Sequence, residues 1–141
     1  MRKLQWNERE ETLDTLFGGR LKIVQRIDGY RFSIDALLLA HFAEPRAGDR
    51  IIDLGTGCGI IPLILIFRKK AERVTGVEIQ SSLVNLARRN AALNRLSNRI
   101  QVLEEDLKNL ERNQWKETFD LVISNPPYRK VGAGRINPQM E

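Results

Sequence analysis

A glycine-rich segment, Gly55-Thr56-Gly57-Cys58-Gly59, follows Asp53 at the end of a short apolar run. Glycine allows the backbone to turn with positive φ and to approach a ligand closely. Dinucleotide-binding proteins have G-x-G-x-x-G here, but Ile60 stands where their third glycine would be. An acid at position 53 does not suit a pyrophosphate, whereas it suits a cationic group such as an ammonium. Taken alone, the segment could equally be a tight strand-to-helix turn.

Two further acids end the next two apolar runs. Glu78 closes the second run, where a carboxylate can accept hydrogen bonds from both hydroxyls of a ribose. Asp106 lies just beyond the third run. Ligands bind at the carboxyl ends of parallel strands, near the point where the strand order reverses, so these acids predict a binding site. For Glu78, a solvated acid near a helix N-terminus remains the alternative.

Four short runs rich in β-branched residues predict the buried strands that would position these acids, at 50–54, 73–78, 100–103 and 119–124. Helical patterns separate them, at 60–70 and within 81–96, where Leu83, Leu86, Ala87 and Asn90 share one face. The alternation predicts an α/β fold with a doubly wound, mostly parallel sheet and right-handed crossovers.

The first 45 residues differ from this pattern. The alternation at 21–25, the turn signal Asp28-Gly29 and the segment 30–32 predict a β-hairpin. Ser33 is placed to cap a helix over Ile34–Phe42, whose apolar face would pack on the sheet. We therefore expect a hairpin-helix extension at 1–45, packed on a core domain at 46–141.

The segment after the fourth strand is rich in Gly, Pro and Asn and has no apolar periodicity. A doubly wound domain normally places more strands beyond this point. We therefore expect a domain that is incomplete at its C-terminus, or an edge that a partner covers. Unpaired backbone groups on an exposed fourth strand would favour self-association there.

The composition limits the classes of partner. A net charge of +5 and a pI near 9.7 suit an anionic partner such as RNA or DNA. The longest apolar run, Ile60–Phe67, is too short to span a bilayer, and no signal-peptide pattern is evident. With Cys58 as its one cysteine, the chain is expected in the cytoplasm. His41 has no companions at ligand spacing, so no metal site is expected.

Together, the glycine segment, Glu78, Asp106 and Asn125-Pro126-Pro127-Tyr128 resemble class I methyltransferases that depend on S-adenosyl-L-methionine (SAM). The resemblance covers 50–128 and is to the branch that methylates planar exocyclic nitrogens. It implies a Rossmann-like, seven-stranded sheet of order 3-2-1-4-5-7-6. It also implies a set of SAM-binding residues: Asp53 at the amino group, Gly55, Gly57 and Gly59 at the methionine part, Glu78 and Ile79 at the ribose, Asp106 and Leu107 at the adenine, and Asn125.

The turn at 125–128 suits methyl transfer to such a nitrogen. The lone pair of an exocyclic amine is delocalised, which makes the amine a poor nucleophile. The side-chain oxygen of Asn125 and the carbonyl of Pro126 could accept its two N–H groups and pull the nitrogen toward tetrahedral geometry. Pro126 and Pro127 fix φ and remove competing donors, and Tyr128 could stack on the planar target. Alone, the turn could equally be a rigid loop with a surface tyrosine.

A closer resemblance extends over nearly the whole chain. Residues 12–42 and 125–138 are similar to the family that methylates adenine N6 beside the anticodon of valine tRNA. It implies that Phe32, Ser33 and Asp35 lie beside the cofactor pocket, and that 129–135 form a loop over the target. The favoured hypothesis is an adenine-N6 methyltransferase acting on tRNA. The alternatives are glutamine N5 methylation of a protein, and a SAM-binding piece that is silent without further chain.

Overall fold

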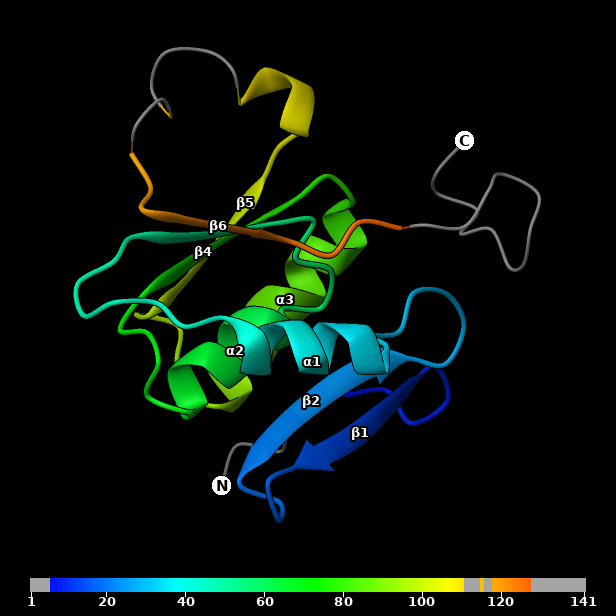
Figure 1. Ribbon diagram of the computed structural model, residues 1–141. Helices are drawn as coiled ribbons and strands as arrows, with labels where there is room; N and C mark the ends of the chain where they lie inside the picture. The colour runs from blue at the N-terminus through cyan, green and yellow to red at the C-terminus, as the bar shows by residue number, and fades with distance from the viewer. Residues whose placement is uncertain (1–5, 111–114, 116–117, 128–141) are drawn as a thin grey trace.

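The computed structural model describes residues 6–110, 115 and 118–127 of the 141-residue chain (Figure 1). Its elements, in chain order, are β1 (Glu11–Leu16), β2 (Leu21–Arg26), α1 (Ile34–Phe42), β3 (Ile51–Leu54), α2 (Ile60–Phe67), β4 (Val74–Glu78), α3 (Ser81–Leu93), β5 (Ile100–Glu104), the 3-10 turn Leu107–Asn109 and β6 (Leu121–Ser124). Among the described residues, no helix is both long and apolar enough to cross a membrane.

Strands β3 to β6 form one parallel sheet in the order β5-β4-β3-β6. This order is the one expected for the first four strands, and the predicted α/β fold with a parallel sheet is confirmed. The chain moves from β3 to β4 to β5 in one direction, and right-handed crossovers then place α2 and α3 on the same face. Within the described residues β6 pairs only with β3, so it lies at an edge of the sheet, as predicted.

The hydrophobic core lies between this sheet and the helices. Figure 1 shows the helices on one side of the sheet, with the hairpin of β1 and β2 beyond them. Helix α2 is apolar on all sides. The sheet, α1 and β2 cover it, so its residues from 60 to 66 are all buried. Burying each of these large aliphatic side chains contributes about 1.5–3 kcal/mol before conformational entropy is subtracted.

The predicted hairpin was wrong in its pairing. β2 pairs with β1, and the turn between them lies at 17–20, where Phe17, Gly18 and Gly19 all have positive φ. Residues 30–32, predicted as the second strand, are not a strand. This segment is held by side chains: the guanidinium of Arg31 donates to Asp14 and to the carbonyl of Arg26. Two consecutive glycines proved a stronger turn signal than Asp28-Gly29.

Helix α1 has the predicted bounds but packs on a different surface. Its buried residues, Ala36 and Ala40, face α2 rather than the parallel sheet. Small side chains allow two helices to approach closely. The larger residues Ile34, Leu38 and Phe42 are exposed, which sequence periodicity alone did not predict.

Candidate active site

The glycine segment forms the turn between β3 and α2. Gly55, Gly57 and Gly59 have φ of 74°, 59° and 85°, in the left-handed region that glycine adopts without steric cost. At Gly57 a Cβ atom would lie 2.6 Å from Cε1 of Tyr30, so any side chain there would displace that ring. The amides of Gly55 and Thr56 both donate to the carbonyl of Val77, at 2.8 and 2.9 Å. These bonds tie the turn to the neighbouring strand β4.

Asp53 lies fully buried beneath this turn. Within the described part of the chain, neither of its carboxyl oxygens has a hydrogen-bond partner. Burial raises the pKa of Asp53 from 3.8 to about 7; the neighbouring Thr56 hydroxyl opposes this rise and the charge of Glu78 adds to it. A buried carboxyl group without a partner is costly. Among the described residues only the Thr56 hydroxyl lies near enough to lower its pKa, so this carboxyl group can accept a further donor or pair with a cation.

Glu78 lies next to it, at the carboxyl end of β4. Its two oxygens accept the backbone N–H groups of Gly57 and Gln80, each at 3.0 Å. A carboxylate has about four lone-pair positions, so two remain for a ligand. The carboxylate therefore holds the glycine turn in place and can still accept hydrogen bonds from a ligand at the carboxyl end of the sheet.

Two aliphatic side chains are exposed at the same end of the sheet. Ile79 directly follows β4 and is 57% exposed, and Leu107 follows β5 and is 43% exposed. Between the strand and Leu107, Asp106 accepts the N–H of Lys108 at 2.9 Å and so caps the 3-10 turn. The apolar side chains beside these acids suit a flat ligand with hydroxyl and amino groups at its rim.

The turn after β6 reaches this end through the strand register. Ser124 is paired with Leu54, and its hydroxyl donates to the Leu54 carbonyl at 3.1 Å. The next residue, Asn125, therefore follows β6 where Gly55 follows β3. Asn125 is half-buried, and Pro126 and Pro127 are exposed. Tyr128 and the predicted loop at 129–135 lie outside the described residues.

Asn90, which sequence reasoning noted only as part of a helix face, joins three elements. Its buried side chain accepts the N–H of Val24 at 2.7 Å and donates to the carbonyls of Val24 and Cys58, at 3.0 and 2.9 Å. One turn later, Asn94 bonds the N–H and carbonyl of Lys22 in the same way. Both asparagines bond backbone groups of β2, and Asn90 alone also bonds the glycine turn. An amide on an otherwise apolar helix face was the available signal.

The segment before α1 also reaches the site, but through a residue that was not predicted. Tyr30 lies against Gly57, whereas Phe32 packs on the hydrophobic core and its N–H bonds the side chain of Gln25. Ser33 is the N-cap of α1 without a side-chain capping bond.

The remaining candidate residues have structural roles. Burial raises the pKa of Cys58 to about 12, so it remains a thiol that fills space. His41 bonds the carbonyl of Leu37 through Nδ1. In the part of the chain that the structure describes, no three potential ligands gather at a metal-binding distance.

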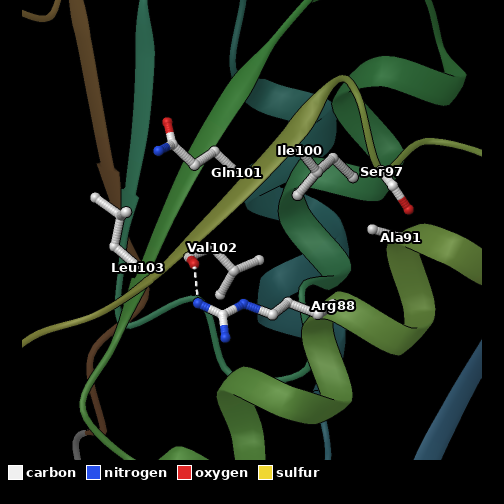
Figure 2. A pocket seen from close by; sticks show the side chains of 7 residues that line it. All are labelled: Arg88, Ala91, Ser97, Ile100, Gln101, Val102 and Leu103. Carbon is white, nitrogen blue, oxygen red and sulfur yellow. Dashed lines mark hydrogen bonds between the residues drawn. The ribbon is translucent and has the colours of Figure 1, made fainter.

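A separate hollow of about 390 Å³ lies between α3 and β5. Figure 2 shows Arg88 extending from α3 to donate to the carbonyl of Val102, at 2.7 Å. This bond satisfies a carbonyl of β5, which lies at the other edge of the sheet. None of the predicted site residues lines this hollow, so Arg88 is assigned to structure.

Comparison with known proteins identifies the family of the chain. The family model described as "Methyltransferase small domain" matches residues 33–139. A tRNA1(Val) (adenine(37)-N6)-methyltransferase from Glaesserella parasuis is 34% identical over 113 residues, covering 79% of this chain and 46% of that protein. One from Porphyromonas gingivalis is 38% identical over 117 residues with the same coverage. The chain thus spans a little less than half the length of these curated relatives.

Solved structures share the fold at lower identity. A SAM-dependent methyltransferase from Agrobacterium tumefaciens superposes with a TM-score of 0.65 at 20% identity, over 87% of this chain and 42% of that one. TrmK from M. capricolum, solved with S-adenosyl-homocysteine (SAH), has a TM-score of 0.56 at 19% identity, over 67% and 41%. The match of the family model over most of the sequence, on a fold that these structures share, shows that the chain belongs to the methyltransferase small domain family.

Proposed function

We propose that this chain binds SAM and forms the cofactor-binding part of a methyltransferase that modifies adenine N6 in tRNA. The single observation that carries the proposal is the buried Asp53 carboxyl group, which has no partner among the described residues and lies under the glycine turn beside Glu78. A ligand with both an ammonium group and a ribose could pair with Asp53 through the ammonium and donate its ribose hydroxyls to Glu78.

The residues present fit SAM. Asp53 would pair with the ammonium of its methionine part, and the free lone pairs of Glu78 would accept the ribose hydroxyls. Ile79 and Leu107 offer apolar contact to the adenine, and Asp106 can accept a hydrogen bond from the adenine amino group. When bound, this cofactor supplies a methyl group on a positively charged sulfonium.

The chain's own contribution to transfer would be positioning. In this proposal the side-chain oxygen of Asn125 and the carbonyl of Pro126 accept the two N–H groups of the target amine. The rigid backbone of Pro126 and Pro127 keeps both acceptors aimed, and Tyr128 stacks on the base. A strong general base is not required, because the nitrogen releases its proton after it has gained positive charge.

RNA is the favoured substrate on two grounds. The curated relatives carry names that specify adenine 37 of tRNA1(Val), and the chain has a net charge of +5. A protein glutamine presents the same planar N–H pair, so it is the alternative that an experiment must separate.

The test measures transfer of a labelled methyl group from SAM to unmodified tRNA and, in parallel, to a release-factor protein. The proposal expects label in tRNA at adenine N6. Label in the protein alone would replace RNA by glutamine as the substrate. Cofactor binding without any transfer would show that the chain is silent by itself.

The matched variants are Asp53→Asn and Asp49→Asn. Among the described residues, the side chain of Asp49 accepts the N–H of Arg46 within a turn, a bond that asparagine can keep. Loss of SAM binding in the first variant but not in the second is expected. Equal binding in both would contradict the assignment of Asp53.

A further inference from the structure

A large basic hollow, of about 1470 Å³, lies between the hairpin and the C-terminal ends of α2 and α3. Because helices in a parallel α/β fold run opposite to the strands, these ends lie at the amino side of the sheet, away from the glycine turn. Helix α3 begins at Ser81, directly after the site residues Glu78 and Ile79, whereas the hollow is lined by its second half, from Arg89 onward, and by none of the predicted site residues. The hollow is therefore a second surface and not an extension of the site.

The charged residues among its described lining are all cationic, and most of the other lining residues are apolar. The six cationic residues are Arg20, Lys22, Lys69, Arg89, Arg95 and Arg99. Such a concentration attracts a polyanion at long range.

Part of this charge is already used inside the protein. Arg89 pairs with Glu11 at 2.7 Å, and Arg99 donates to the carbonyls of Ala71 and Glu72. Arg20 donates to the carbonyl of Phe17 and lies over the ring of Phe67. Within the described part of the chain, none of the ion pairs includes Arg20 or the other lining cations Lys22, Lys69 and Arg95. These four side chains carry charge that no described carboxylate neutralises.

Two of them occupy positions where glycine is usual. Lys69 and Arg95 have φ of 57° and 59°, each just after the end of a helix. The N–H of each residue donates to the helix carbonyl three residues earlier, and the N–H of the next residue donates to the carbonyl five residues before itself. These two hydrogen bonds form the Schellman motif, in which glycine is favoured. Both helices therefore accept a strained cation instead of glycine, and both cations face the same hollow. Strain retained twice at one surface indicates a use beyond folding.

We propose that this basic hollow binds the sugar-phosphate backbone of the RNA, at a place separate from the residues assigned to the target base. The identity of the polyanion rests on the proposed function, whereas the hollow and its charge do not. Arginine presents a planar fork that matches phosphate oxygens, and a concave surface suits a strand better than a flat bilayer. The hollow would orient the body of the RNA while its target nucleotide reaches the other end of α3.

The test compares Lys69→Gly/Arg95→Gly with the unaltered chain in binding an unmodified tRNA transcript, by fluorescence anisotropy over a salt series. Two lost phosphate contacts should weaken binding at low salt and reduce the slope of log affinity against log salt by about 1.4–1.8. Because glycine is favoured at both positions, the melting temperature should stay equal or rise. The affinity for SAH should not change. Lys69→Asn/Arg95→Asn provides a second pair that tolerates the same backbone.

The control is Arg46→Gln/Arg68→Gln, which removes the same charge from two exposed residues that do not line the hollow. The slope should be kept in this control. An unchanged slope in both test pairs, an equal loss in the control, or no binding of tRNA by the unaltered chain would overturn the inference. Displacement of tRNA by polyglutamate at equal charge would assign the hollow to acidic protein and overturn the RNA assignment.

Failure of this inference is distinguishable from failure of the proposed function. Methylation of tRNA with unchanged binding in the glycine pair would reject the hollow alone. Loss of tRNA binding in that pair, in a chain that transfers no methyl group to RNA, would reject the proposed reaction alone.

Discussion

The change Asn90→Ala tests how the fold holds the glycine turn. It removes three hydrogen bonds and leaves the N–H and carbonyl of Val24 and the carbonyl of Cys58 without their buried partner. Each unsatisfied buried group costs about 1–3 kcal/mol, with the smaller values where water can enter. The free energy of unfolding should therefore fall by about 3–5 kcal/mol, a large part of the stability of a domain of this size.

The matched control is Asn94→Ala, four residues later on the same helix. Asn94 bonds Lys22 in the same way, but its surroundings are only partly buried, so water can replace the lost bonds. Urea unfolding followed by circular dichroism should show a loss of about 1–2 kcal/mol for Asn94→Ala. Calorimetry should show weaker SAH binding for Asn90→Ala alone, because only Asn90 bonds the glycine turn at Cys58.

Two results would refute this reasoning. One is a loss below about 1 kcal/mol for Asn90→Ala, which would mean that water or repacking satisfies the freed groups. The other is an equal loss of SAH affinity in both variants, which would remove the link from Asn90 to the turn.

Three further predictions concern the site and the sheet edge. Asn125→Ala should lower turnover much more than cofactor affinity, measured by single-turnover transfer and calorimetry, because Asn125 is assigned to the target amine; equal losses would count against that role. Glu78→Ala should weaken SAH binding, since it removes the ribose acceptor and the bond that holds Gly57; an unchanged dissociation constant would reject the assignment. If the exposed edge of β6 mediates self-association, sedimentation should show a mass that rises with concentration, and a constant monomer mass would exclude it.

The parallel strands and their order followed from the sequence because apolar, β-branched runs alternating with helical periods allow few topologies. The site acids Asp53, Glu78 and Asp106 were found for the same reason, because the carboxyl ends of parallel strands lie at the same end of the sheet. The end of α2 was less predictable: the helix stops at Phe67, and the residue that adopts positive φ is Lys69, which carries no breaker signal. The boundary between 1–45 and 46–141 remains a prediction.

Contacts between residues far apart in the chain could not be predicted from sequence patterns. The hairpin turn lies at Gly18-Gly19, and the segment after β2 is held by side-chain bonds of Arg31 to Asp14 and to the carbonyl of Arg26 instead of by strand pairing. The contact of Tyr30 with Gly57 and the bonds of Asn90 join residues far apart in the chain. Such contacts depend on tertiary packing, which local periodicity does not report.

The pH dependence of SAH binding, measured by calorimetry, shows whether the Asp53 carboxyl group receives the ammonium of the cofactor. Burial raises the pKa of Asp53 from 3.8 to about 7, so between these values the folded chain holds a proton that the unfolded chain has released. The free energy of unfolding therefore falls as pH rises through this window, by about 4 kcal/mol in total. An ammonium ligand selects the carboxylate, so binding expels this proton below pH 7.

We expect an SAH dissociation constant about eightfold higher at pH 6.0 than at pH 7.5, with Asp53→Asn binding weakly at both. Folding of the variant is checked by urea unfolding, where loss of the buried carboxyl should leave stability equal or higher at pH 7.5. A dissociation constant that does not change with pH, or an Asp53→Asn variant that binds as tightly as the unaltered chain, would contradict the claim that this carboxyl group receives the cofactor's ammonium.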